Sequence, residues 1–122
     1  MNSILLIDDD EQFRTMLSEV LRRAGYEVQE ARDGAEGTKL YRDHPADLIL
    51  TDLIMPEKEG LEIIQEFRRD HPKVKIIAMS GGGRHGSYDY LKIAKAFGAQ
   101  QVLAKPFSHQ EILETIIQVL EA

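Results

Sequence analysis

Short apolar runs alternate along this chain with longer stretches in which apolar residues recur every three or four positions. The apolar runs with the length of β-strands are 3–7, 48–52, 74–79 and 101–104, and residues 27–31 alternate between polar and apolar, which also indicates a strand. The stretches with helical spacing are 11–24, 34–43, 60–70, 87–97 and 108–120. These strand–helix repeats predict an α/β fold, a doubly wound five-stranded parallel sheet with right-handed crossovers and helices on both faces. Of the two common strand orders for such sheets we expect 2-1-3-4-5.

The same spacing predicts which helix residues face the sheet. In the first helix they are Phe13, Met16, Leu17, Val20, Leu21 and Ala24. In the fourth helix they are Leu91, Ala94 and Phe97, and in the last they are Ile112, Leu113, Ile116 and Leu120. We expect Asp10 to cap the first helix, Gly98 to end the fourth, and Ser108 with Glu111 to form a capping box on the last.

Composition narrows the class of protein. A chain of 122 residues has the usual size of one domain, so we expect residues 1–122 to form a single domain. There is no signal-peptide pattern, no cysteine, and no apolar stretch near the roughly 20 residues of a membrane span. These features favour a cytoplasmic protein without membrane insertion. The net charge of −6 argues against direct nucleic-acid binding, which requires a basic surface. The basic pairs at 22–23 and 68–69 do not provide one, because they fall at predicted helix ends, where positive charge complements the helix dipole.

Polar residues follow the apolar part of four predicted strands. They are Asp8, Asp9 and Asp10, then Asp52, Ser80 and Lys105. An open parallel sheet places its ligands just outside the carboxyl ends of its strands, so these side chains should share one pocket. Two unit charges 4 Å apart repel by about 4 kcal/mol at an effective dielectric of 20, so the carboxylates need a compensating cation. Mg²⁺ fits, with Asp9 and Asp52 as preferred ligands and Asp8 contributing directly or through water.

Asp52 is the candidate nucleophile, because a carboxylate can attack phosphorus and form an acyl phosphate. We expect the Lys105 ammonium to pair with Asp52 before the reaction and with a phosphoryl oxygen afterwards. The Ser80 hydroxyl would donate a hydrogen bond to the same group. Pro106 and Phe107 follow the lysine directly and would fix its turn in apolar packing. The pocket therefore predicts phosphoryl transfer to an aspartate.

Taken together, these motifs resemble the receiver domain of two-component response regulators along the whole chain. They are Ile4-Leu5-Leu6-Ile7-Asp8-Asp9-Asp10, Thr51-Asp52-Leu53-Ile54-Met55-Pro56 with Gly60, Ser80-Gly81, and Ala104-Lys105-Pro106-Phe107. The resemblance implies a flavodoxin-like fold and Mg²⁺-dependent phosphorylation of Asp52 by a sensor histidine kinase or a histidine phosphotransfer protein. It also implies slow self-catalysed hydrolysis, a switched surface for a downstream protein target, a metal ligand from the backbone carbonyl of Ile54, and a cis Lys105-Pro106 bond. Whether phosphorylation creates a dimer stays open.

Two features depart from the family pattern. Val102 stands where the family usually has an aromatic residue, three positions before the lysine, so an aromatic rotamer switch is absent. The segment from Ser80 to Lys105 is about three residues longer than usual and opens with the glycine-rich stretch 81–86. We therefore expect the signal to leave through that stretch and the start of the fourth helix, around Tyr88, Tyr90 and Leu91.

Three other functions fit the sequence less well. Gly81, Gly83 and Gly86 satisfy Gly-x-Gly-x-x-Gly, but this dinucleotide-binding motif normally opens the first strand–helix unit. An aspartyl-phosphate phosphatase would use Asp8-x-Asp10 and would leave Asp52 without a role. A pure docking module would not need the whole polar set. The four histidines lack metal-ligand spacing.

Overall fold

The computed structural model describes residues 2–53, 60–80, 92 and 94–122. The strands are β1 (Ser3–Ile7), β2 (Glu27–Ala31), β3 (Leu48–Asp52), β4 (Ile76–Ser80) and β5 (Gln101–Ala104). The helices with stated bounds are α1 (Glu11–Arg23), α2 (Gly34–Asp43), α3 (Gly60–Asp70) and α5 (His109–Glu121). Residues 92 and 94–97 are also helical and belong to the expected fourth helix, whose start lies outside the described residues.

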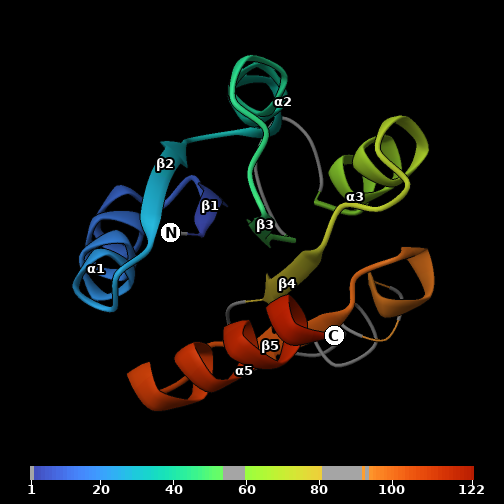
Figure 1. Cartoon of the computed structure of the whole chain (residues 1–122). Coiled ribbons are helices and arrows are strands. Elements are labelled where there is room, and N and C mark those ends of the chain that lie inside the picture. Colours follow the sequence, from blue (N-terminus) through green and yellow to red (C-terminus); the bar gives the residue numbers. More distant parts are fainter. Residues whose placement is uncertain (1, 54–59, 81–91, 93) are drawn as a thin grey trace.

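The strands form one parallel sheet in the order β2-β1-β3-β4-β5, which confirms the predicted topology. In Figure 1 the sheet runs diagonally, with α2 and α3 on one side and α1 and α5 on the other. The register pairs Ile7 with Thr51 and Ser80 with Ala104, so the carboxyl ends of β1, β3, β4 and β5 lie along one edge. This edge carries the polar residues that the sequence singled out.

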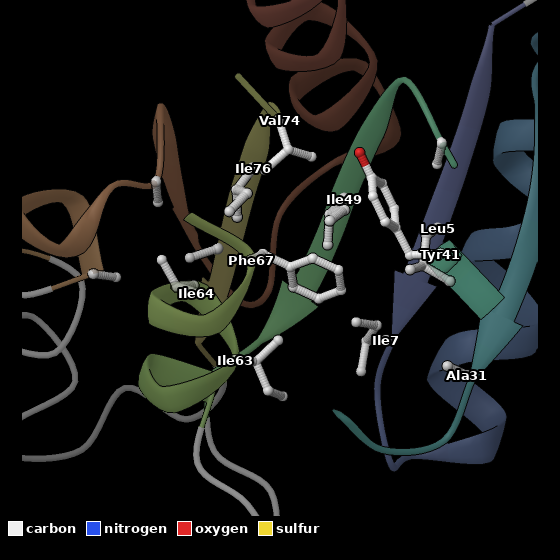
Figure 2. Packing of buried hydrophobic residues seen from close by; sticks show 14 of the residues in the cluster. Leu5, Ile7, Ala31, Tyr41, Ile49, Ile63, Ile64, Phe67, Val74 and Ile76 are labelled. Carbon is white, nitrogen blue, oxygen red and sulfur yellow. The ribbon is translucent and has the colours of Figure 1, made fainter. Parts of the chain in front are cut away.

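Alternation along the buried strands divides the core between the two faces of the sheet. Leu5 and Ile7 of β1 point into a cluster with residues of α2 and α3. Figure 2 shows this cluster, in which Tyr41 of α2 and Phe67 of α3 meet edge to face with ring centroids 5.3 Å apart. The other cluster joins the alternate residues of the strands to α1 and α5. Since both faces are covered, the central strands β1, β3 and β4 are largely apolar, whereas the edge strand β2 carries Glu27, Gln29 and Glu30 and is mostly half-buried.

The inward faces of the helices were predicted only in part. In α1, Leu17 and Leu21 are buried, but Met16 is 41% exposed and Ala24 is also exposed. The buried face instead includes Ser18. The helix is therefore rotated about its axis relative to the prediction, so that the Ser18 side of Leu17 faces the sheet and the Met16 side faces solvent. In α5, Ile112 and Ile116 are buried as expected, together with Val119, while Leu113 and Leu120 are partly buried.

The helix ends follow the predicted capping, except that only one of the two hydrogen bonds of the expected Ser108–Glu111 capping box is formed between these two described residues. The Asp10 side chain accepts a hydrogen bond from the Phe13 amide, and Ser108 accepts one from the Glu111 amide. Gly98 has φ +125°, a left-handed conformation that favours glycine after a helix. Before it, Ala94 is buried as predicted, but Phe97 is 37% exposed, which contradicts the expected inward position; Leu91 lies outside the described residues.

Strand β4 begins two residues later than position 74, where the apolar run begins. The Val74 amide donates to the His71 carbonyl in a turn, and the Ile76 amide donates to the side chain of Gln100 at 2.7 Å. Arg68 joins the same end of the sheet, donating to the carbonyl of Pro72 at 2.7 Å. The guanidinium of Arg68 therefore binds the backbone after α3, in addition to placing a positive charge at the negative end of the helix dipole.

Candidate functional site

Three carboxylates meet at the carboxyl edge of the sheet. Asp8 and Asp9 directly follow β1, and Asp52 is the last residue of β3. One oxygen from each lies within 4.8 Å of the others. Asp8 is fully buried and Asp52 is 6% exposed, whereas Asp9 is exposed. The sequence therefore predicted correctly that these residues come together.

The Lys105 ammonium lies between two of these carboxylates. Its Nζ is 2.8 Å from Asp8 Oδ2 and 3.8 Å from Asp52 Oδ2. The sequence predicted pairing with Asp52, but the shorter contact is with Asp8. The Asp10 amide donates to the other oxygen of Asp8 at 2.9 Å, which orients this buried carboxylate and leaves Oδ2 to the lysine. Such charge-assisted hydrogen bonds are about twice as strong as neutral ones.

The backbone holds Lys105 at this edge. Its amide donates to the carbonyl of Ser80 at 2.8 Å, which continues the β4–β5 pairing beyond the end of β5. The Lys105-Pro106 bond is cis, as the family resemblance implied. Ser80 itself is fully buried, and its hydroxyl has no hydrogen-bond partner within the described part of the chain. A buried donor without a partner costs roughly 1–3 kcal/mol, so this hydroxyl is suited to an oxygen-rich ligand.

Two contacts of the site were not expected from the sequence. Arg14 donates to the backbone carbonyl of Asp8 at 2.8 Å and forms an ion pair with Glu30 at 3.3 Å. It thus ties the loop after β1 to β2. A positive charge near the start of a helix interacts unfavourably with the helix dipole. The position of Arg14 in the first part of α1 was therefore the one sequence signal that this side chain has another partner.

The second unexpected contact is aromatic. The Lys105 Nζ lies 3.9 Å from the centroid of the Phe13 ring, while helical spacing predicted only a core position for Phe13. Phe107 packs edge-on against the same ring, with centroids 6.0 Å apart and planes at 82°. Phe107 also packs against the core cluster, as its position after the lysine predicted.

Other predicted site features fall outside the described residues. They are the backbone carbonyl of Ile54, the glycine-rich stretch 81–86 with its Gly-x-Gly-x-x-Gly pattern, and Tyr88, Tyr90 and Leu91 at the start of the fourth helix. Val102 is described: it lies on β5 opposite Ala78 and is partly buried against the core.

The donor set fits a hard divalent cation. Its three side-chain donors are all carboxylate oxygens, which is the ligand type that Mg²⁺ prefers. At separations of no more than 4.8 Å and an effective dielectric of 20, each pair of carboxylates repels by at least about 3.5 kcal/mol. The single ammonium of Lys105 balances only part of that charge. A cation next to Asp9, the exposed member, would complete the neutralisation.

Comparisons with known proteins agree with this geometry. The sequence model of the family "Response regulator receiver domain" matches residues 4–117. The chemotaxis protein CheY of Thermotoga maritima is 33% identical over 117 residues, covering 95% of each chain. The transcriptional regulatory protein CpxR of Klebsiella pneumoniae is 34% identical over 120 residues, and this chain spans about half (50%) of its length.

A solved structure shares the fold as well. The crystal structure of a response regulator receiver domain protein from Clostridium thermocellum has a TM-score of 0.91 at 28% identity, covering 99% of this chain and 95% of that one. Receiver domains generally bind Mg²⁺ at an acidic pocket, which corresponds here to Asp8, Asp9 and Asp52. None of the described helices is long and apolar enough to span a membrane. The chain belongs to the response regulator receiver domains of two-component signalling, and it is CheY-like.

Proposed function

We propose that residues 1–122 form a single receiver domain that is phosphorylated on Asp52 by a sensor histidine kinase or a histidine phosphotransfer protein. The observation that carries this proposal is the Lys105 ammonium beside Asp52, at 3.8 Å, within a cluster of three carboxylates. The phosphorylated domain would then bind a downstream protein target. Family membership supports both kinds of partner.

The proposed reaction is a displacement at phosphorus. A carboxylate oxygen of Asp52 attacks the phosphorus of a phosphohistidine, and the bond from phosphorus to the imidazole nitrogen breaks. The electron pair of that bond stays on the imidazole, which takes a proton from solvent. When bound, Mg²⁺ would neutralise phosphoryl oxygens and position them. Asp9 and Asp52 would hold it, with Asp8 contributing directly or through water, and with the Ile54 carbonyl as a further ligand.

The remaining side chains act on the transferred group. The Lys105 ammonium moves from its resting contacts onto a phosphoryl oxygen, where it balances charge that Asp52 has gained. The Ser80 hydroxyl, buried and unpartnered within the described residues, donates to another phosphoryl oxygen. Hydrolysis then proceeds by attack of water on phosphorus, with the Asp52 carboxylate as leaving group. The domain would thus catalyse its own phosphorylation and dephosphorylation.

Intact-mass measurement after incubation with a small acyl phosphate tests this proposal. With Mg²⁺ present, the protein should gain one phosphoryl group, and chelation of the metal should abolish the gain. Asp52→Asn should remain folded and gain none, whereas Asp43→Asn, which removes an exposed carboxylate on α2, should behave like the unmodified protein. Continuous turnover of a phosphomonoester without a phosphorylated protein would instead favour a phosphatase.

A further inference from the structure

We propose that Phe13 is a positioning residue that holds the Lys105 ammonium on Asp8 and away from Asp52. Its consequence for phosphorylation rests on the proposed function, but the contact itself does not. Within the described part of the chain, the Nζ of Lys105 makes three close contacts: Asp8 Oδ2 at 2.8 Å, Asp52 Oδ2 at 3.8 Å, and the Phe13 ring centroid at 3.9 Å.

These contacts divide between two segments of the fold. Asp8 and Phe13 both belong to the β1–α1 segment, whereas Asp52 ends β3. A cation within about 6 Å of an aromatic face is attracted by the ring quadrupole, and the attraction grows when the cation is desolvated. The Lys105 side chain is only 16% exposed. The ring and the Asp8 carboxylate therefore act together to keep the ammonium at the β1–α1 segment.

The ring is held in the orientation that this contact requires. Phe107 lies edge-on to it at 82°, with the centroids 6.0 Å apart. Both aromatic residues also pack against the core cluster beneath α1 and α5. Because Phe107 follows the lysine by two positions, the same β5–α5 turn that supplies the ammonium also supports the ring beside it. The geometry is that of a fixed site for the resting ammonium.

A group that favours the resting position opposes the shift of Lys105 toward a ligand on Asp52. A contact can bias such an equilibrium only through its different strength in the two positions. The ammonium needs to move only a short way, so part of the ring contact survives the shift. Phe13→Leu should therefore strengthen binding of a phosphoryl-like ligand at Asp52 about fivefold, equivalent to about 1 kcal/mol.

The first measurement detects the contact without any phosphorylation. The ε-methylene protons of Lys105, observed by NMR, should be shifted upfield by the ring current of Phe13. Phe13→Leu should abolish this shift, and Phe13→Tyr, which keeps a ring face, should retain most of it. If Phe13→Leu leaves the Lys105 resonances where they are, the inference is overturned.

The second measurement uses beryllofluoride with Mg²⁺ as the phosphoryl-like probe. Phe13→Leu should lower the dissociation constant about fivefold, and Phe13→Tyr should restore the original value. The matched control is Tyr26→Leu, which removes an aromatic ring packed on the same cluster but lying beyond the far end of α1; it should leave affinity unchanged.

A double-mutant comparison shows whether the ring acts through the ammonium. In a Lys105→Met background, Phe13→Leu should have no further effect on beryllofluoride binding. Unchanged or weaker binding by Phe13→Leu alone, or the same effect of Phe13→Leu with and without Lys105, would overturn the inference. If the unmodified protein binds neither beryllofluoride nor a phosphoryl group, the proposed function fails, and the NMR measurement then decides the inference about Phe13.

Discussion

Replacement of Lys105 by methionine should destabilise the domain in the absence of divalent metal. The ammonium lies 2.8 Å from Asp8 Oδ2, where a pair of unit charges attract by about 6 kcal/mol at an effective dielectric of 20. Desolvation of both groups offsets part of that attraction. The variant, however, leaves a fully buried Asp8 carboxylate without its cation, while Asp52 and Asp9 still repel it. Breaking a buried pair in this way costs roughly 3–5 kcal/mol, and we expect about 3 because Lys105 is partly accessible.

Urea unfolding with and without Mg²⁺ measures this cost. Without metal, the free energy of unfolding of Lys105→Met should fall by about 3 kcal/mol, and added Mg²⁺ should restore more stability to the variant than to the unmodified protein. The reason is that the variant lacks the ammonium that repels the metal. Lys39→Met, on the exposed side of α2, is the matched control and should lie within about 0.5 kcal/mol of the unmodified protein.

Two outcomes would refute this reasoning. If Lys105→Met without metal is as stable as the Lys39→Met control, the ion pair with Asp8 contributes nothing to the fold. If Mg²⁺ stabilises the variant less than the unmodified protein, the lysine and the metal do not compete for the same carboxylates.

Three smaller perturbations should also have defined effects. Asp9→Asn should raise the thermal midpoint of the metal-free protein, because one of three mutually repelling carboxylates is neutralised, and should reduce the shift caused by Mg²⁺. Ser18→Ala should raise the free energy of unfolding by about 1 kcal/mol in urea titrations, because its buried hydroxyl has no partner within the described residues. Burial, with the Asp47 carboxylate adding to it, raises the pKa of Tyr41 above its ordinary value of 10.0. The unfolded chain therefore ionises first, so stability should fall as pH rises past about 10, and Tyr41→Phe should lessen that fall in pH-dependent unfolding.

Each of these has a contrary result. A lower thermal midpoint for metal-free Asp9→Asn would mean that attraction to neighbouring positive groups outweighs carboxylate repulsion at Asp9. Loss of stability in Ser18→Ala would mean that the hydroxyl is satisfied, and an unaltered alkaline limb in Tyr41→Phe would assign that limb to other groups.

The fold was largely predictable because buried strands and amphipathic helices leave different patterns of apolar residues in the sequence. Buried parallel strands give uninterrupted apolar runs, and the residues that follow them fall at one sheet edge whatever the details of packing. That rule brings Asp8, Asp9, Asp52, Ser80 and Lys105 together. It depends on the order of elements alone, so it is insensitive to errors in individual side chains.

Two kinds of detail were not predictable: the rotation of a helix about its own axis, and differences of about 1 Å between side-chain contacts. A helical stripe about 100° wide does not distinguish a face that includes Met16 from one that includes Ser18, since both neighbour Leu17. Likewise, strand-end placement brings Lys105 near two carboxylates without saying which is closer. That choice depends on the Asp10 amide, which orients Asp8 at 2.9 Å. The ring of Phe13 over the lysine is a contact between segments far apart in sequence, and no local pattern encodes it.

The central claim is that Asp52 accepts the phosphoryl group, and locating the modified residue tests it most directly. The protein would be phosphorylated with a small acyl phosphate and Mg²⁺, and the acyl phosphate reduced at once with borohydride, which converts a phosphorylated aspartate to homoserine. Peptide mass mapping should then find homoserine at position 52 and aspartate at positions 8 and 9. Homoserine at either of those positions, or unmodified aspartate at position 52 in a protein that has gained a phosphoryl group, would contradict the account.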